Sequence, residues 1–527
     1  MIRRRFLFGA LMLALFSLGW WVGRAATGDL YTNLDVFVEV LHRVQDNYVD
    51  PVKPARAVTG AIEGMLKDLD PYSQYLTADD YAGLQSVAQG KFSGIGVVVG
   101  LHGDFPTVIS PIEGSPAWEA GLHSGDVIVK IDATSTAELT VEGVAKLLRG
   151  GEGTKVTVVV AREGEPGEQS YALTRREIVT QSVPYAFMAG NDLGYVRLAN
   201  FSEKSGAEVR DALTRLRAEG ARCFVLDLRM NPGGLLDQAV DVAEQFLPKG
   251  AMVVSTRGRA RNQDQRYYAG HAAGDVRSPL VVLIDEGSAS ASEIVAGALQ
   301  DLDRALVIGR TSFGKGSVQS IYPLSGMDTA IKLTTALYYT PSGRSIHRPR
   351  LAGFDPNAEP DDPTPADSSQ DTTVTRPVFH TAAGRIVHGG GGITPDVAGP
   401  ADSLAGLARE IERRGLTFRF ANKWVNEHPG VTASATLPET IWSAFGAYLR
   451  GENLKAEDGA LAAERAVIER SVRRELARRT GGDAAAMRIA LEGDAVFGRA
   501  AAILEHSLRP GDVFATAVGD RSHLPAR

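Results

Sequence analysis

The stretch Leu280–Gln319, LVVLIDEGSASASEIVAGALQDLDRALVIGRTSFGKGSVQ, decides the fold of this chain. It opens with a short apolar run, 280–284, rich in β-branched residues, which predicts a buried strand. A turn follows, and apolar residues then recur at helical spacing from 294 to 299, which predicts a helix. A serine at such a strand-to-helix turn can be exposed beside helix N–H groups that favour negative charge. Further on, glycines flank Lys315 and let the backbone fold tightly around it.

The serines of this turn have two interpretations. Ser290 and Glu293 fit a capping box. In this motif the serine side chain caps the helix, and the side chain of the glutamate three residues later accepts the backbone N–H of the serine. Because such motifs are common helix starts, the pattern by itself favours plain capping. Lys315 taken alone is likewise a solvated loop lysine more often than a base. Pattern alone therefore does not decide between a structural and a catalytic turn.

Two segments, GSASASEI at 287–294 and GKGSVQ at 314–319, resemble the active site of the carboxy-terminal processing peptidases, also called tail-specific proteases. The resemblance implies that Ser290 is the nucleophile, that Lys315 is its general base and that Gln319 orients the lysine. Ser290 and Lys315 are 25 residues apart, as in that family. A lysine serves as a base only if its pKa falls far below the reference of about 10.4, which burial in an apolar cleft can achieve.

A second strand-to-turn motif lies upstream. The apolar run 224–228 predicts a buried strand, 232–234 forms a Pro-Gly-Gly turn, and a helix is predicted over 235–246. Such a turn aims backbone N–H groups outward, as an oxyanion hole requires, although a plain tight loop is the commoner structure. The surrounding DLRxNxGG motif also resembles the peptidase family. That resemblance implies that the N–H groups of Ala291 and Gly233, with Gly234 as its neighbour, hold the developing oxyanion.

Strands alternating with helices from 193 to 337 predict an α/β layer with parallel strand pairing. The family resemblance implies a multi-domain α/β protein with a crotonase-like peptidase core over residues 179–400. Within it, 355–376 is rich in Pro, Asp, Ser and Thr, which predicts an exposed or disordered insertion. Residues 401–527 predict a helical C-terminal extension, which the family resemblance does not reach. Its predicted helices are 460–476 and 484–508.

A different unit begins at the segment containing Gly94, Ile95 and Gly96. The two glycines can present successive N–H groups as a nest for a carboxylate, and the valines that follow predict a strand whose edge could pair with a peptide. The order of strands and helices that follows, with a helix predicted over 141–148, resembles a PDZ domain inserted at 91–178. The resemblance implies that Gly94, Ile95 and Gly96 receive the terminal carboxylate of a substrate tail.

The N-terminus has the composition of an export signal. Arginines at 3–5 precede an apolar run over 6–22. This is the form of a secretory signal, and at about 17 residues it is also near the lower limit for spanning a bilayer. We expect residues 1–26 to be a cleaved signal peptide or a membrane anchor, and the mature protein to be periplasmic, where the anchor would hold it at the inner membrane. A buried N-terminal helix is the structural alternative. Residues 27–90 are predicted to be helical.

The whole chain excludes several classes of function. Its 527 residues suggest three or four domains, and a net charge of −7 gives no general basic field for nucleic acid. A single cysteine, Cys223, excludes an intrachain disulfide framework and reads as a small core hydrophobe. The ten histidines lack ligand spacing, so neither a metal nor another cofactor is predicted.

Taken together, the motifs predict a C-terminal processing serine endopeptidase that recognises protein substrates by their free C-terminal tails. Self-association and an adaptor protein are left open as further partners. Two alternatives stand beside this prediction. The chain could be a PDZ scaffold whose peptidase core is inactive, or the core could act on a small acyl substrate, as other crotonase-like enzymes do.

Overall fold

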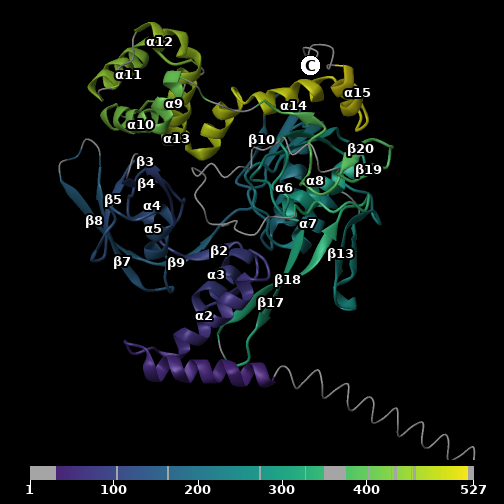
Figure 1. Ribbon diagram of the computed structural model, residues 1–527. Coiled ribbons are helices and arrows are strands. Elements are labelled where there is room, and N and C mark those ends of the chain that lie inside the picture. The colour runs from purple at the N-terminus through teal and green to yellow at the C-terminus, as the bar shows by residue number, and fades with distance from the viewer. Residues whose placement is uncertain are drawn as a thin grey trace, which may run out of the picture. The chain divides into compact units, whose positions relative to one another are not determined.

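The computed structural model (Figure 1) describes residues 31–102, 105–162, 165, 167–271, 274–326, 328–348, 376–400, 404, 406–428, 430–431, 436–452, 454 and 458–519. The predicted leader 1–26 lies outside these residues, as does the predicted insertion 355–376 except for Arg376. The chain divides into two compact units. The first is Met1–Ala78 with Gln319–Thr334, and the second is Asp79–Val318 with Thr335–Arg527.

The first unit holds the N-terminal helices. Its elements are a helix over 31–47, α2 (Pro54–Lys67), β1 (Gln74–Leu76) and the first part of β18 (Ala330–Tyr339). β1 pairs antiparallel with β18, so the prediction of helix for this region is wrong at these residues. The reason is the turn before β1, where the Asp70 carboxylate accepts the N–H groups of Tyr72 at 2.8 Å and Ser73 at 2.9 Å. The next helix, α3 (Ala78–Ala88), begins two residues after the end of β1.

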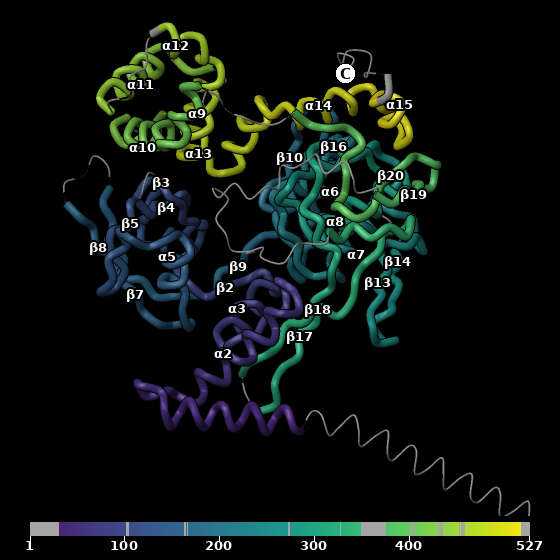
Figure 2. The backbone as a smooth tube through the Cα atoms, viewed as in Figure 1, coloured from purple at the N-terminus to yellow at the C-terminus, as the bar shows by residue number. Residues whose placement is uncertain are grey.

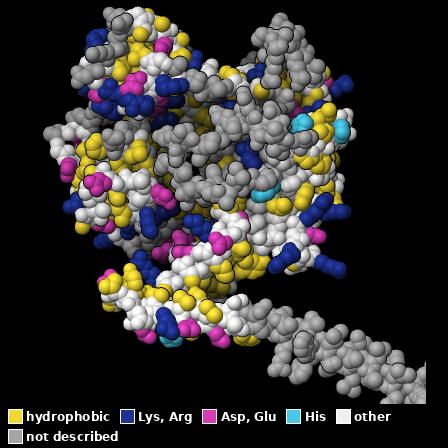
Figure 3. All heavy atoms as spheres, viewed as in Figure 1, with side chains coloured by type: hydrophobic (Ala, Val, Ile, Leu, Met, Phe, Trp, Pro, Cys, Tyr) yellow, Lys and Arg dark blue, Asp and Glu magenta, His cyan; other side chains and the backbone are white. Residues whose placement is uncertain are grey.

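The helix over 31–47 exposes apolar side chains along its length (Figure 3). The large hydrophobic side chains that are at least one third exposed are Tyr31, Leu34, Val36, Phe37, Val38, Val40 and Val44. An amphipathic helix ordinarily buries such residues against a neighbour. Within the described residues this helix therefore presents an apolar surface.

The predicted inserted domain has its own core. Its elements are β2 (Lys91–Gly94), β3 (Val97–His102), β4 (Phe105–Pro111), α4 (Pro116–Glu119), β5 (Val127–Ile131), β6 (Thr134–Ser135), α5 (Val141–Leu148), β7 (Lys155–Ala161), β8 (Glu168–Thr174) and β9 (Arg176–Val179). Strands β3, β4, β5, β7 and β8 form one antiparallel sheet, and β2 pairs with β9. Alternate residues of β7 are buried, as the period of a strand with one covered face requires. Helix α5 has its predicted bounds because Thr140 accepts the N–H of Gly143 at 3.1 Å and caps it.

The central sheet has the order β10-β11-β12-β15-β16-β21. Its strands are β10 (Tyr185–Met188), β11 (Leu193–Arg197), β12 (Cys223–Asp227), β15 (Leu280–Ile284), β16 (Leu306–Gly309) and β21 (Val397–Ala398). All pairs are parallel except β10 with β11, which confirms the predicted parallel layer. The helices α6 (Ser205–Ala218), α7 (Leu236–Ala243) and α8 (Ala291–Asp301) contribute to the hydrophobic core of one face.

The central strands read as continuous apolar runs because both faces of the sheet are covered. In β12, Phe224 and Leu226 belong to the core on the side of α6, α7 and α8. Cys223 and Val225 belong to the opposite core, which includes residues of the C-terminal extension. Cys223 is buried, as predicted, and burial raises the pKa of its thiol to about 12. Each face of the sheet therefore has its own hydrophobic core.

The prediction of parallel pairing up to residue 337 is wrong for the later strands. β13 (Met252–Gly258) pairs antiparallel with β14 (Gln265–Tyr268) and with the last part of β18. β13 and β14 are separated by only a few residues, which suffice for a hairpin but not for the crossover that parallel strands need. These strands form a second sheet, separate from the central one. β17 (Ser317–Pro323) also belongs to this second sheet.

The C-terminal extension is helical, as predicted, but neither of its two predicted helices is continuous, and the one over 460–476 is broken at Glu464. Its helices are α9 (Gly406–Arg413), α10 (Leu416–Glu427), α11 (Glu439–Gly451), α12 (Asp458–Ala463), α13 (Arg465–Leu491), α14 (Ala495–Glu505) and α15 (Asp512–Gly519). The predicted helix 484–508 is interrupted after Leu491, and Asp494 starts α14 by accepting the N–H of Phe497 at 2.9 Å. α14 contacts β12, β15 and β16, and Figure 2 shows it beside β16. No helix in the described part of the chain is long and apolar enough to cross a bilayer.

Candidate active site

Two parallel strands end next to each other at the candidate site. β12 pairs with β15 so that Asp227 lies opposite Leu283. The turn 228–234 leaves β12, and the turn 285–290 leaves β15 and enters α8. Because ligands of parallel sheets bind at the carboxyl ends of the strands, these turns are where a site is expected. They carry the predicted oxyanion glycine and the predicted nucleophile.

The three serines of the second turn lie in different environments. Ser288 and Ser292 are fully buried, and their hydroxyls donate to the carbonyl oxygens of Leu228 at 2.8 Å and Asn231 at 2.9 Å. Ser290 is only half-buried, and its backbone N–H donates to Glu293 Oε2 at 2.8 Å, which is one half of the expected capping box. Its φ of 55° lies in the left-handed region, which is strained for a residue with a side chain. Only Ser290 of the three is therefore free to meet a substrate.

Glu293 links the predicted nucleophile to the predicted base. One oxygen of its carboxylate, Oε2, accepts the backbone N–H groups of both Ser290 at 2.8 Å and Lys315 at 2.9 Å. The other oxygen accepts the Ser312 hydroxyl at 2.5 Å and the Gly314 N–H at 2.8 Å. The chain segments around residues 290 and 315 thus meet at one carboxylate.

Burial raises the pKa of the Glu293 carboxyl above its ordinary value, and its four donors oppose that rise. The side chain is completely buried, so the donors replace the water that the carboxylate has lost. The sequence suggested only a capping partner for this residue. The donors from Ser312 to Lys315 could not be read from the sequence, because they come from a loop that follows a different strand.

The predicted base lies in a loop that is held at its backbone. The side chain of Lys315 is half-buried, and its carbonyl oxygen accepts the hydroxyl of Tyr338. Gly314 has a φ of 90°, and its carbonyl oxygen accepts the N–H of Arg348 at 2.9 Å. The predicted need for glycine beside this lysine is therefore met at Gly314.

Gly233 lies against the nucleophile. A Cβ added at this glycine would stand 2.8 Å from the Ser290 Cβ and 2.9 Å from the Ala291 nitrogen. Its φ of 96° is one that residues with side chains rarely adopt. Its own N–H donates to Asn231 Oδ1 at 2.9 Å. The structure thus brings the predicted oxyanion residues together, with the N–H of Gly233 already bonded within the turn.

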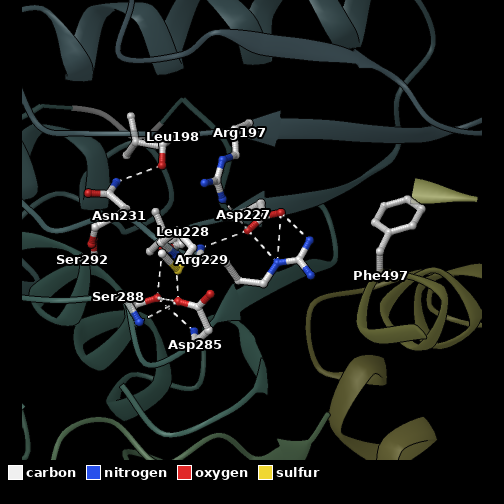
Figure 4. A network of polar contacts seen from close by, with 12 residues as sticks. Arg197, Leu198, Asp227, Leu228, Arg229, Asn231, Asp285, Ser288, Ser292 and Phe497 are labelled. Atoms are coloured by element: carbon white, nitrogen blue, oxygen red, sulfur yellow. Dashed lines mark hydrogen bonds and ion pairs between the residues drawn. The ribbon is translucent and has the colours of Figure 1, made fainter. Parts of the chain in front are cut away.

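The start of this turn is fixed by a buried ionic network (Figure 4). The fully buried Asp227 accepts the Tyr195 hydroxyl at 2.8 Å and pairs with Arg229 at 2.7 Å and with Arg197 at 3.1 Å. Burial by itself raises the pKa of the Asp227 carboxyl, but the two guanidiniums outweigh this effect and hold it below its ordinary value. Burial and the neighbouring Asp227 raise the pKa of the Tyr195 hydroxyl. Asp227 is therefore a stable anion beneath the turn.

The two turns are joined by hydrogen bonds beyond those of the serines. The N–H of Met230 donates to Asp285 Oδ1 at 2.7 Å, and the N–H of Ala289 donates to the Asn231 carbonyl at 3.0 Å. Met230 has a φ of 51°, the left-handed conformation that lets its N–H reach the neighbouring turn. The nucleophile turn and the glycine turn consequently form one rigid assembly.

Gln319 is placed in the first of the two units. Its side-chain amide donates to the Thr334 hydroxyl at 3.3 Å, and that hydroxyl donates to Asp70 at 3.1 Å. The Thr334 N–H donates to the Ser73 hydroxyl at 3.1 Å. The predicted role of Gln319 toward Lys315 stays a prediction, but these bonds fix the amide nitrogen of its side chain toward Thr334.

The predicted tail-binding residues lie where β2 ends and β3 begins. Ile95 is buried, and its carbonyl oxygen accepts the Ala117 N–H at 2.9 Å. Gly96 has a φ of 77°, and its carbonyl oxygen accepts the Ser115 hydroxyl at 2.9 Å. Gly94 is the last residue of β2. The loop is thus fixed in shape before any ligand binds, while its role in binding a tail stays a prediction.

Among the residues that the structure describes, no group of three or more His, Cys, Asp or Glu side chains could hold a metal ion.

Three segments of the chain match models of known protein families. Residues 192–359 match Peptidase family S41, residues 107–162 match a PDZ domain, and residues 24–80 match the Activating protease CtpB N-terminal domain. The first match contains both turns and the lysine loop. The fold and these matches therefore define the class of serine peptidases with an inserted PDZ domain.

Similar proteins agree with this class. The chain is 43% identical over 324 residues to a carboxy-terminal-processing protease of Bartonella bacilliformis, covering 60% of this chain and 73% of that protein. It is 38% identical over 312 residues to the carboxyl-terminal-processing protease of Synechocystis, covering 58% of this chain and 72% of that protein. Among solved structures, the photosystem II D1 C-terminal processing protease shares 31% identity with a TM-score of 0.36, covering 59% of this chain and 89% of that one. The chain belongs to the carboxy-terminal-processing proteases of peptidase family S41, which confirms the predicted family, fold class and enzyme class.

Proposed function

We propose that this peptidase works through a Ser–Lys dyad of Ser290 and Lys315. Ser290 Oγ attacks the peptide carbonyl carbon, and its proton passes to the neutral Lys315 amine. The protonated amine then gives the proton to the leaving nitrogen, and water releases the acyl group from Ser290 by the same steps in reverse order. One observation carries the proposal. Of the three serines in the turn, only Ser290 has a hydroxyl that is not buried, and Glu293 ties its backbone to that of Lys315.

The oxyanion is assigned to the N–H groups of Ala291 and Gly233. A side chain at Gly233 would collide with Ser290 and Ala291, so glycine is what lets this turn lie so close to the nucleophile. The N–H of Gly233 donates to Asn231 in the absence of substrate, so it must share this hydrogen bond with the oxyanion when the intermediate forms. In the same proposal, the Gln319 amide orients the Lys315 amine.

Substrates are proposed to be proteins with free C-terminal tails, bound by the PDZ domain. Gly94, Ile95 and Gly96 would receive the tail carboxylate, and the adjacent edge of β3 would pair with the extended tail. The preformed loop around Gly96 supports this role, because a site that is fixed in advance loses little entropy on binding.

The remaining partners and the location follow from the N-terminal region. The exposed apolar side chains of helix 31–47 favour self-association, although an adaptor would suit the same surface. The arginine-flanked apolar segment 6–22 favours export to the periplasm, with residues 1–26 either removed or kept as an inner-membrane anchor.

Incubating the protein with an unfolded substrate bearing an apolar C-terminal tail tests both halves of the proposal. We expect cleavage by the wild type and its loss in Ser290→Ala. Amidating the tail removes the charge that the nest binds, so affinity for the tail should fall at least about tenfold. Equal calorimetric affinity for acid and amide would refute the tail assignment, and full activity of Ser290→Ala would refute the dyad.

A further inference from the structure

The C-terminal extension contacts the turn of the proposed oxyanion site through one ion pair. Asp494 Oδ2 lies 2.6 Å from Arg229 Nη2, and the other oxygen of the same carboxylate caps α14. Arg229 lies two residues beyond the end of β12, at the start of the glycine turn. The match to the peptidase family ends at residue 359, so Asp494 lies outside the segment that the family shares.

Asp494 completes the charge balance of the network beneath that turn. The network holds two guanidiniums, those of Arg197 and Arg229, and the carboxylate of Asp227 (Figure 4). The side chains of Arg229 and Asp494 are only 16% and 13% exposed, so solvent screens this pair weakly. Without Asp494, two largely buried cations would share one anion. Burial lowers the pKa of Arg229, but the two carboxylates outweigh it and raise that pKa.

Arg229 is connected to the reacting atoms through its chain neighbours. The carbonyl of Leu228 accepts the Ser288 hydroxyl, and the N–H of Met230 donates to Asp285, both in the nucleophile turn. Met230 is in the left-handed conformation. The guanidinium, whose Nη2 contacts both Asp227 and Asp494, therefore fixes the backbone between two hydrogen bonds on which the placement of the turn depends.

We propose that Asp494 is a positioning residue of the peptidase site, through which the C-terminal extension holds the glycine turn in its reactive geometry. The proposal rests on the proposed function in one respect, since it takes this turn to supply an oxyanion donor. In this proposal, the C-terminal extension supports the peptidase site in addition to packing on one face of the central sheet. Asp494 acts through Arg229 and does not touch the substrate.

The alternative is that Asp494 only docks α14 on the sheet, and the experiment must distinguish this role from positioning of the glycine turn. α14 also packs on the sheet through apolar contacts, among them Phe497, whose ring meets that of Tyr195 edge-on at 5.8 Å. If docking were the whole role of Asp494, activity would follow the stability of α14. If positioning is its role, activity follows the negative charge that faces Arg229.

Two substitutions in the full-length protein separate charge from capping. Asp494→Asn keeps a good N-cap but loses the charge. Asp494→Glu keeps the charge on a longer side chain that caps less well. Asp512→Asn is the matched control, because Asp512 accepts the N–H groups of Leu508 and Arg509 near the start of α15, within the same extension. For each variant, kcat, KM and the melting midpoint are measured on one peptide substrate. Each rate is compared with the wild type at a temperature where the variant is folded.

We expect Asp494→Asn to lower kcat about tenfold with KM nearly unchanged, because a charge-assisted hydrogen bond to the turn is lost. Asp494→Glu should retain more of kcat than Asp494→Asn, even where its melting midpoint is the lower of the two. Asp512→Asn should leave kcat unchanged. A wild-type kcat in Asp494→Asn, or rates that follow the melting midpoints, would overturn the proposal. Either result is distinct from a failure of the dyad, which is read from Ser290→Ala alone.

Discussion

The turn that carries the proposed nucleophile and the loop that carries the proposed base are held in place differently. The nucleophile turn, 285–290, is fixed by short polar side chains of its own and of α8, which bond to the neighbouring turn 228–234. The base loop, 314–316, is fixed through backbone N–H groups that share the single carboxylate of Glu293. The nucleophile turn is therefore held by several short side chains. In the base loop, one buried carboxylate from another element holds two N–H groups, beside the bonds from Tyr338 and Arg348.

This difference indicates how each part should respond to substitution. Removing one of the side chains that hold the nucleophile turn leaves the others in place. Such a change should lower the free energy of unfolding more than it lowers kcat. Removing the carboxylate that holds the base loop should cost rate directly, because general-base catalysis requires its donor and acceptor within hydrogen-bond reach. The four predictions below test that contrast in order of decreasing effect.

The largest effect is expected for Ser290→Ala, which removes the nucleophile itself. Single losses in a serine-peptidase catalytic unit lower kcat by roughly 10⁶-fold, and we expect a loss of that order in peptide hydrolysis. Ser288→Ala and Ser292→Ala are the controls from the same segment. Each removes one buried hydrogen bond and should lower the free energy of unfolding by about 1–3 kcal/mol while keeping measurable activity. Comparable losses of activity in all three variants would contradict the contrast between them.

Lys315→Arg should have the next largest effect, because arginine keeps the positive charge but cannot be deprotonated in a protein. General-base help is worth about 10²–10⁴-fold, so kcat should fall by that factor. The wild-type rate should rise with pH until the Lys315 amine is neutral, and the arginine variant should lack this rise. Near-normal turnover in Lys315→Arg would show that charge alone suffices and would rule out a Ser–Lys mechanism.

Glu293→Gln tests the carboxylate that accepts the N–H groups of Gly314 and Lys315 in the base loop. Each oxygen of the Glu293 carboxylate accepts two hydrogen bonds. In the variant, the amide nitrogen of glutamine would replace one of these oxygens and could not accept them, so at least one pair of hydrogen bonds would be lost. We expect kcat to fall about 10²-fold, since bonds to a charged group are worth about 1.5–3 kcal/mol each. Glu286→Gln is the control, because Glu286 pairs with Arg310 at the surface, where their side chains are 57% and 49% exposed. Equal rates in the two variants would mean that the base loop does not depend on Glu293.

The smallest effect concerns Asp227, the anion beneath the glycine turn. Its folded-state pKa is lowered, so it contributes stability above the unfolded-state pKa of about 3.9 and loses it as the pH falls below that value. Urea unfolding between pH 7 and pH 3 should show the wild type losing about 1 kcal/mol more stability than Asp227→Asn. Parallel pH profiles would mean that Asp227 is not held as an anion.

Much of the fold could be predicted from local pattern. The strand at Leu280–Ile284 and the helix at Val141–Leu148 have their predicted bounds, because apolar runs and capping residues act over a few positions. The helix predicted over 484–508 was interrupted, because Asp494 caps a new helix inside an apparently continuous pattern. The predicted parallel pairing extended too far along the chain, to residue 337, because an apolar pattern does not indicate which strands pair with each other.

The candidate site divides in the same way. The sequence by itself determined the family, the turn that bears Ser290 and the glycine-flanked loop of Lys315, since these are short motifs whose chemistry depends on adjacent residues. Only the tertiary structure decided that Ser288 and Ser292 are buried, that Glu293 joins the nucleophile to the base loop, and that Asp494 pairs with Arg229. The physical reason is that burial and charge pairing depend on residues that are distant in the chain and meet only when the strands pair and the C-terminal helices pack on the sheet.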